Sequence, residues 1–196
     1  MKRLDPRSPL LFDTKELSRR PGAMLTVTRS VAVPEPVGTD VIAVPANRSI
    51  DIELRLESVV EGVLATGAVT TVAAGLCVRC LEPLTLPVTA TFQELFVHPD
   101  KAAHHREVAA DDTEIPDYEL VDDLIDLEPV LVDALVPALP FQPVCQADCP
   151  GLCVECGVPL ADNPGHIHER LDPRWSALAS LAGDRGSADP PSTKGT

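Results

Sequence analysis

Alternating apolar and polar residues in the first half of the chain predict β-strands. In the segment SIDIELRLE, apolar residues at every second position from Ile50 to Leu56 alternate with charged residues from Asp51 to Glu57. A period of two places the apolar side chains on one face, so the segment is predicted to be a strand with one buried face. The segment LTLPVTATFQELF repeats this pattern with Leu84, Leu86, Val88, Ala90 and Phe92.

Further strand candidates lie before and between these two segments. They are AMLTVTRSVAV, DVIAVP and residues 62–74, a stretch rich in Val and Thr in which Gly67 predicts a bend or bulge. Because short turns join the strands, we expect them to pair antiparallel in a sheet that is partly curled into a barrel.

The segment DLEPVLVDALVPALP predicts a helix after the strands. Asp126 is a plausible N-cap and Pro129 lies in the first turn. Pro137 is expected to end the helix near Leu135 or Val136, since proline lacks a backbone N–H. One side of the helix is apolar and should face the core, with Leu127, Val130, Leu131, Ala134 and Leu135. The expected fold class is α+β, an antiparallel, partly barrel-like sheet with one or two short helices and a zinc-bound C-terminal segment.

Composition divides the chain into an arm, one domain and a tail. Residues 1–20 are interpreted as a basic N-terminal arm, because residues 1–29 contain seven Lys and Arg residues against three acids. The arm is either a solvated tail or a segment that contacts phosphate groups. Residues 21–182 are expected to form a single domain, which closes with a second short helix that has Asp172 as N-cap and Trp175 as a packing anchor. Residues 183–196 are rich in Gly, Ser and Pro and are predicted to be disordered.

A run of acidic residues follows the last strand. Residues 107–133 contain eleven acids and no Lys or Arg, and a mobile acidic loop is predicted over 99–120. This loop is either ordinary solvated surface or a segment that masks a basic protein. The net charge of −14 disfavours DNA binding through a broad basic face and is compatible with a basic partner.

No segment of the sequence has the pattern of a signal peptide or a membrane span. The basic start is followed only by the short apolar run of residues 10–12, whereas a signal peptide needs about 7–15 apolar residues and a membrane span about 18. We therefore expect a cytoplasmic protein, a monomer without a membrane or DNA partner. Thiols stay reduced in that compartment, so a cysteine cluster there indicates metal binding or catalysis more than disulfides.

Six cysteines and a histidine pair are the candidate chemical groups. Four cysteines and both histidines lie in CQADCPGLCVECGVPLADNPGHIHE, residues 145–169, and two cysteines lie upstream in GLCVRCLEP. Redox chemistry would place a Cys-x-x-Cys at the start of a helix, but one pair lies between strand segments and the other precedes Gly157 and Pro159. A catalytic zinc would leave an open coordination position near an acid or base, and no motif of that kind is present.

The number and spacing of these residues favour structural zinc. Two-residue spacing lets both thiolates of a pair face one ion, and Gly157 permits the tight turn that this requires. His166 and His168 lie on the same side of an extended backbone. Eight residues would form two closed tetrahedral sites, and they are Cys77, Cys80, Cys145, Cys149, Cys153, Cys156, His166 and His168. Three further histidines near the acidic loop are expected to be solvated, namely His98, His104 and His105.

The eight ligands can be divided in two ways. The preferred division has one site of Cys77, Cys80, Cys145 and Cys149 and a second of Cys153, Cys156, His166 and His168. It gives each site two short pairs and ties the C-terminal segment to the sheet, although about 65 residues separate the two cysteine clusters. The alternative closes the four cysteines of residues 145–156 on one ion.

Several motifs together carry a resemblance to a known family. They are GLCVRCLEPL, FQELF before an acidic loop, DLIDLEPVLVDALVPALPFQPVC, and DCPGLCVECGVPLADNPG followed by DPRWSALASL. From about Leu11 to Leu181 the chain resembles the YceD family of bacteria and plastids, the large ribosomal RNA subunit accumulation proteins. Many relatives have Cys-x-Cys where this chain has His166-Ile167-His168, a change that keeps metal-binding chemistry. Some relatives lack the second cluster, which suggests that the second site is an elaboration.

The resemblance implies a non-catalytic ribosome biogenesis factor that supports accumulation of large-subunit ribosomal RNA. The family defines no catalytic residues. The expected partners are a large-subunit precursor, its rRNA or a basic ribosomal protein. The basic arm and Arg79 would contact RNA, or the acidic run would contact the protein. A zinc-dependent hydrolase and a thiol redox sensor are the alternatives.

Overall fold

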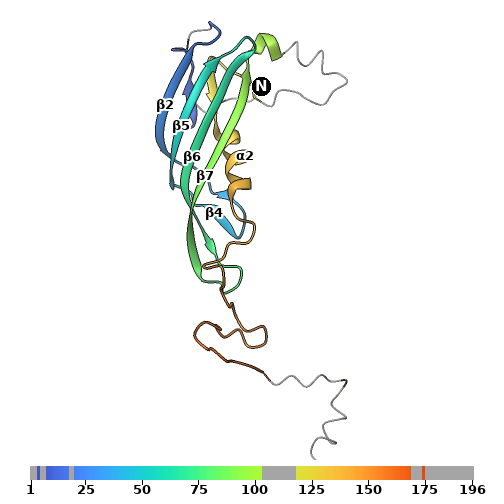
Figure 1. Cartoon of the computed structure of the whole chain (residues 1–196). Helices are drawn as coiled ribbons and strands as arrows, with labels where there is room; N and C mark the ends of the chain where they lie inside the picture. The colour runs from blue at the N-terminus through green and yellow to red at the C-terminus, as the bar shows by residue number, and fades with distance from the viewer. Residues whose placement is uncertain (1–3, 5–7, 18–19, 103–117, 169–173, 175–196) are drawn as a thin grey trace, which may run out of the picture. The chain divides into compact units, whose positions relative to one another are not determined.

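The computed structural model (Figure 1) describes residues 4, 8–17, 20–102, 118–168 and 174. The chain divides into two compact units, Met1–Cys149 and Pro150–Thr196, and every named strand and helix lies in the first unit. The predicted tail lies outside the described residues, and so does the predicted second helix apart from Arg174. A single domain over residues 21–182 therefore stays a prediction.

An antiparallel six-stranded sheet forms most of the first unit, as the alternating pattern predicts (Figure 1). Its strands run in the order β2-β5-β6-β4-β3, and β7 also pairs with β6. The bounds are β2 Met24–Ala32, β3 Val37–Gly38, β4 Ile42–Val44, β5 Ser49–Ser58, β6 Gly62–Leu76 and β7 Pro83–Val97. A second sheet pairs only β1 (Leu11–Asp13) with β8 (Leu124–Asp126).

The burial of β5 and β7 confirms the alternation of their sequences. In β5, the apolar residues from Ile50 to Leu56 are buried, and the charged residues from Asp51 to Arg55 between them are exposed. In β7, the side chains of Val88, Ala90 and Phe92 are buried. The sheet is not a closed barrel, because its outer strands β2 and β7 do not pair with each other among the described residues. Other elements cover its apolar face instead.

Strand β6 passes through Gly67 without the predicted bend or bulge. Gly67 pairs in continuous register with Leu54 of β5 and Phe92 of β7. A Cβ atom at Gly67 would lie 2.6 Å from Cζ of Phe92 and 2.7 Å from the carbonyl oxygen of Glu53. The glycine is needed because an aromatic ring packs directly on its backbone, which is the other common reason for a glycine inside a strand.

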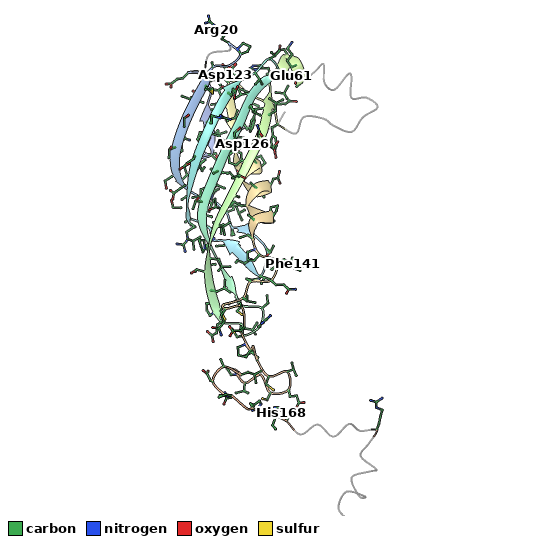
Figure 2. The ribbon with its side chains drawn as sticks, in the orientation of Figure 1. Arg20, Glu61, Asp123, Asp126, Phe141 and His168 are labelled. Atoms are coloured by element: carbon green, nitrogen blue, oxygen red, sulfur yellow. The ribbon has the colours of Figure 1, made fainter. Side chains whose placement is uncertain are left out.

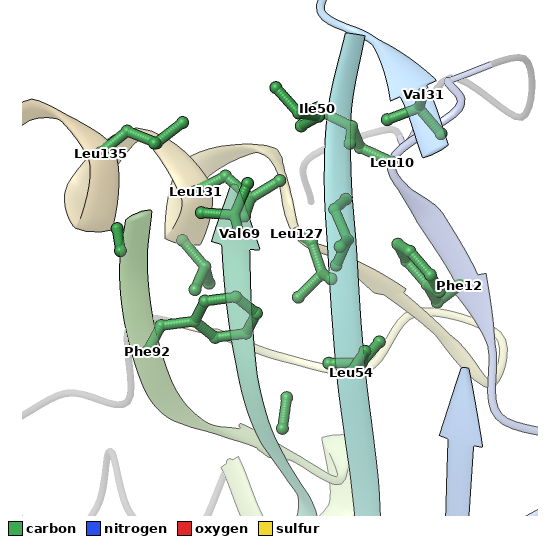
Figure 3. Packing of buried hydrophobic residues seen from close by; sticks show 14 of the residues in the cluster. Leu10, Phe12, Val31, Ile50, Leu54, Val69, Phe92, Leu127, Leu131 and Leu135 are labelled. Carbon is green, nitrogen blue, oxygen red and sulfur yellow. The ribbon is translucent and has the colours of Figure 1, made fainter. Parts of the chain in front are cut away.

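Helix α2 (Glu128–Ala138) covers the apolar face with the predicted apolar side. Leu127, Val130, Leu131 and Leu135 are buried, and Ala134 packs against the same core. Figure 3 shows Leu131 and Leu135 of α2 among the buried side chains of the core. The core therefore lies between the six-stranded sheet on one side and α2 with β1 on the other.

The ends of α2 differ from the prediction. The N-cap is Leu127 rather than Asp126, although the Asp126 carboxylate accepts a hydrogen bond of 3.1 Å from the N–H of Glu128. The helix continues through Pro137 to Ala138. Pro137 lies in the last turn, where its missing N–H removes a single helical hydrogen bond and no later turn depends on it.

Part of the predicted basic arm belongs to the fold. The side chains of Leu10 and Phe12 are buried in the core, and β1 pairs with β8. Arg29 of β2 holds this segment, because its Nη1 donates to the carbonyl oxygens of Pro9 at 3.1 Å and Leu11 at 2.9 Å. The Arg29 guanidinium also lies 4.0 Å from the centre of the Phe12 ring. Four cationic residues of the predicted arm lie outside the described residues, namely Lys2, Arg3, Arg7 and Arg19.

Both described ends of the predicted acidic loop are structured. Residues 99–102 are helical, and Leu120 is buried and donates its N–H to the Val97 carbonyl at 3.0 Å. Residues 103–117, with His104 and His105, lie outside the described residues. Among the helices in the described part of the chain, none is long and apolar enough to cross a membrane.

Replacement of Gly67 by alanine is expected to lower the free energy of unfolding by about 1–3 kcal/mol, the usual range for overpacking. The added methyl group would overlap the Phe92 ring and the backbone of Glu53. Urea denaturation measures the change. Thr66→Ala is the control, because Thr66 is half-exposed and lies on the opposite face of β6. An unchanged unfolding midpoint for Gly67→Ala would show that the ring does not pack on β6.

Candidate metal centres

The loop between β6 and β7 holds the first pair of cysteines. Leu76 at the end of β6 pairs with Pro83 at the start of β7, so Cys77 and Cys80 lie in the loop of residues 77–82. The segment after α2 supplies Cys145 and Cys149, and the four sulfur atoms lie within 4.8 Å of one another. We call these four residues the first metal group. The fold thus joins two cysteine pairs that are distant in sequence.

The sulfur atoms of the first metal group have the spacing that a tetrahedral ion requires. Sγ of Cys77 lies 3.9 Å from Sγ of Cys149, and Sγ of Cys80 lies 3.7 Å from Sγ of Cys145. Zn–S bonds of about 2.3 Å imply tetrahedron edges of about 3.8 Å. Four thiolates are also a usual donor set for structural zinc, so both the geometry and the chemistry of the group fit this ion.

Backbone N–H groups around the loop favour the thiolate of Cys77. The N–H groups of Cys80, Cys145 and Arg79 lower the pKa of the Cys77 thiol to about 6, while burial of the thiol acts in the opposite direction. The pKa of Cys145 is instead raised to about 12, chiefly by its hydrogen bond with Cys149. Neighbouring thiols can ionise together only when a cation compensates their charge, so a bound metal ion would be needed for all four to become thiolates.

The second unit contains the second metal group, which consists of Cys153, Cys156, His166 and His168. Nε2 of His166 lies 3.2 Å from Sγ of Cys156 and 2.9 Å from Nε2 of His168, which itself lies 3.3 Å from the same sulfur. A tetrahedral zinc would set these separations at about 3.4–3.6 Å. The donor atoms fit zinc once the histidine rings separate by up to about half an ångström.

Glu155 supports the second metal group from outside. Its Oε2 lies 3.3 Å from Nδ1 of His168. A metal-bound histidine usually directs its second ring N–H at a carboxylate, which fixes the tautomer. Glu155 thus presents Nε2 of His168 as the ligand atom. Glu155 was not among the residues expected to take part in the site, although its place between Cys153 and Cys156 is a local signal that could have identified it.

The N–H groups of this second turn also act on a thiol. Those of Cys156 and Glu155 lower the pKa of the Cys153 thiol to about 7. Each Cys-x-x-Cys turn therefore directs backbone N–H groups at its first cysteine and favours the thiolate, which is the form that binds metal.

The two Cys-x-x-Cys turns share one backbone geometry. In each, the residue after the second cysteine donates its N–H to the carbonyl of the first cysteine, at 2.9 Å from Leu81 to Cys77 and 2.8 Å from Gly157 to Cys153. The N–H of the first cysteine donates to the carbonyl five residues later, at 2.9 Å in both turns. The residue after the second cysteine is left-handed in both, with φ of 62° at Leu81 and 72° at Gly157. Gly157 was expected to permit this tight turn, whereas a leucine in the same conformation is strained.

Arg79 and His98 lie in surroundings that differ from those expected from the sequence. Arg79, expected to contact phosphate, donates from Nη1 to the carbonyl oxygens of Ala147 at 3.3 Å and Cys149 at 3.1 Å. It therefore holds the loop that carries Cys149. His98, expected to be solvated, is half-buried and lines a cavity of about 210 Å³ together with Ser58.

The structure brings the eight predicted ligands together according to the preferred division. One group lies in the first unit and the other in the second, and either could hold a metal ion. That these residues bind zinc stays a prediction.

Comparisons with known proteins point to one family. A family model described as large ribosomal RNA subunit accumulation protein YceD matches residues 65–182. An uncharacterized protein of Mycobacterium tuberculosis is 45% identical over 176 residues, which cover 90% of this chain and 83% of that protein. An uncharacterized protein of Mycobacterium leprae is 39% identical over 174 residues, 89% of this chain and 78% of that protein. No solved structure matches the chain significantly.

The chain belongs to the YceD family, and the matched span contains both metal groups. The family's description supports a ribosome-related role.

We expect the purified protein to contain two zinc ions per chain. Elemental analysis should show that Cys77→Ser loses one ion and Cys153→Ser the other, because the two residues belong to different groups. Cys77→Ser should also lower the thermal unfolding midpoint of the sheet, whereas Cys153→Ser should not. The grouping is wrong if Cys145→Ser and Cys153→Ser remove the same ion while Cys77→Ser leaves it bound.

Glu155→Ala is expected to weaken zinc binding at the second metal group by about 10–100-fold, the usual effect of losing a carboxylate behind a histidine ligand. Competition with a coloured chelator measures the affinity. Asp162→Asn, an exposed acid in the same unit, serves as the control. Equal zinc affinities for Glu155→Ala and the parent protein would mean that the carboxylate does not orient His168.

Proposed function

We propose that the protein is a non-catalytic factor in ribosome biogenesis that supports accumulation of large-subunit ribosomal RNA. It binds a precursor of the large subunit, through the rRNA or through a basic ribosomal protein. The family match over residues 65–182 is the observation that carries this proposal. We expect the protein to act in the cytoplasm as a monomer, without binding DNA or membranes.

Both metal groups are proposed to hold structural zinc. Each group has four protein donor atoms, which leave no open position for a substrate or a reactive water. A bound ion would contribute folding free energy, on the order of 10 kcal/mol in small zinc peptides. In the first unit it would tie the segment after α2 to the β6–β7 loop. In the second unit it would organise residues 150–168, where the structure describes turns and a bridge between Leu152 and Pro159.

The geometry gives less support to the two alternative functions. A zinc-dependent hydrolase needs a coordination position that the protein leaves open. A thiol redox sensor needs accessible thiolates that are free of metal. Cys145 and Cys156 are exposed, but each belongs to a group of four donor atoms that could hold one ion. We therefore propose that the metal groups maintain a binding surface rather than perform chemistry.

The protein should co-sediment with large-subunit precursors in a sucrose gradient, and its depletion should lower large-subunit rRNA relative to small-subunit rRNA. If phosphate groups are the contact, association should fall by about one log unit per log of salt for each phosphate bound. Charge reversal of Arg19 and Arg20 would then reduce co-sedimentation without loss of zinc. If a basic protein is the contact, neutralisation of Asp111, Asp112 and Glu114 would reduce it instead.

The outcome against the proposal is a wild-type protein that stays in the free-protein fractions even in cells that accumulate assembly intermediates. An intact zinc content in the same preparation would exclude misfolding as the reason.

A further inference from the structure

Five large apolar side chains are exposed around the first metal group. They form what we call the apolar loop surface, with exposed fractions from 41% to 93%, and are Val41, Leu76, Val78, Leu81 and Phe141. Backbone hydrogen bonds connect their segments. The N–H of Leu76 donates to the Val41 carbonyl at 3.2 Å, and the N–H of Val78 donates to the Pro143 carbonyl at 2.9 Å. Exposed apolar patches of about a few hundred Å² commonly mark interaction sites.

The presence of a leucine at position 81 is not explained by the stability of the fold. It is left-handed and 58% exposed, so its side chain is strained without contributing to the core. The second Cys-x-x-Cys turn makes the same hydrogen bonds with Gly157 at the equivalent position. Glycine would therefore build the first turn with less strain. A strained, exposed apolar residue where glycine would serve points to a role outside the folded unit.

Phe141 is exposed to an unusual degree for an aromatic residue. The other three phenylalanines, Phe12, Phe92 and Phe96, are buried in the core, whereas Phe141 is 93% exposed. Figure 2 labels Phe141 in the segment that follows α2. Pro143, two residues later, accepts the hydrogen bond from Val78 and so fixes this segment against the metal-binding loop. Large aromatic side chains are the residues that most often dominate binding at protein interfaces.

The charges around the surface select a cationic occupant. Exposed Asp40 and Glu82 adjoin Val41 and Leu81 in the sequence, and exposed Asp148 adjoins Cys149 of the first metal group. The one cation of the loop, Arg79, donates to two carbonyl groups of the chain. Nucleic acid phosphates would be repelled here, and so would a second copy of a chain with net charge −14.

We infer that the apolar loop surface binds a lysine- and arginine-rich protein segment whose apolar side chains contact Leu81 and Phe141. This inference rests on the proposed function and selects a protein over RNA as the partner at this surface. The aliphatic residues are suited to apolar contacts, and the surrounding acids are suited to the cationic residues of the partner.

Two variants remove the surface with little risk to the fold. Leu81→Gly copies the second turn and relieves the left-handed strain, and Phe141→Ala truncates a side chain that is almost fully exposed. Val60→Ala is the matched control, because Val60 is an exposed apolar residue in the loop between β5 and β6. Each full-length variant is compared with the wild type against two probes. One is the total protein extracted from large ribosomal subunits, and the other is protein-free large-subunit rRNA.

The wild type is expected to retain one or more proteins that mass spectrometry identifies as rich in Lys and Arg. Leu81→Gly and Phe141→Ala should each weaken that binding by about tenfold or more, while Val60→Ala leaves it unchanged. Zinc content should be equal in all four proteins. Retention of no such protein, equal binding by the two variants, or loss of rRNA binding rather than protein binding would overturn the inference. So would a dimer of the wild type that either variant dissociates.

The result can be separated from a failure of the proposed function. If the wild type and Phe141→Ala co-sediment equally with precursors, the function stands and the surface has no part in it. If the wild type retains a basic protein through this surface but never co-sediments with precursors, the inferred surface stands and the proposed function fails.

Discussion

Four thiol groups within 4.8 Å of one another impose the constraint on which the organisation of the first unit depends. Thiolates at this separation repel one another. Four cysteines can therefore lie this close only as protonated thiols or as thiolates around a cation. Backbone N–H groups already lower the pKa of Cys77, which favours the charged form that binds metal. With an ion present, the β6–β7 loop and the segment after α2 become a single structural element.

The rest of the first unit places these two segments close together. Strand β7 pairs with β6 along its whole length, so the loop between them is held at both ends. Helix α2 packs on the sheet through buried leucines and directs the chain that follows it to the same place. Arg79 of the β6–β7 loop donates to the carbonyl groups of Ala147 and Cys149 and so joins this loop to the segment after α2. Zinc would therefore act on a site that the sheet has largely assembled.

The same turn serves two purposes in this chain. Its hydrogen bonds and left-handed position recur in both metal groups, but one turn has Leu81 where the other has Gly157. The turn in the second unit has glycine, the residue that a left-handed backbone favours. The turn in the first unit departs from it and exposes an apolar side chain. A departure of this kind is expected where binding rather than folding determines the residue.

Local periodicity determined which segments of this protein became strands. The buried face of β5 and the inner residues of β7 follow from alternation alone, because a strand places successive side chains on opposite faces whatever its partners. Residue type and short spacing likewise identified the eight candidate ligands. These features depend on neighbours within a few positions, so a single sequence contains them.

Contacts between distant segments were decided only by the tertiary structure. Cys80 and Cys145 are 65 positions apart, and the pairing of β6 with β7 together with the course of α2 brings them to one place. Gly67 is accommodated as a straight strand residue because Phe92 of the next strand lies over it, and Arg29 is an anchor because Phe12 lies beneath it. In each case a residue's role depends on a neighbour that only the folded chain supplies, and no local pattern contains that information.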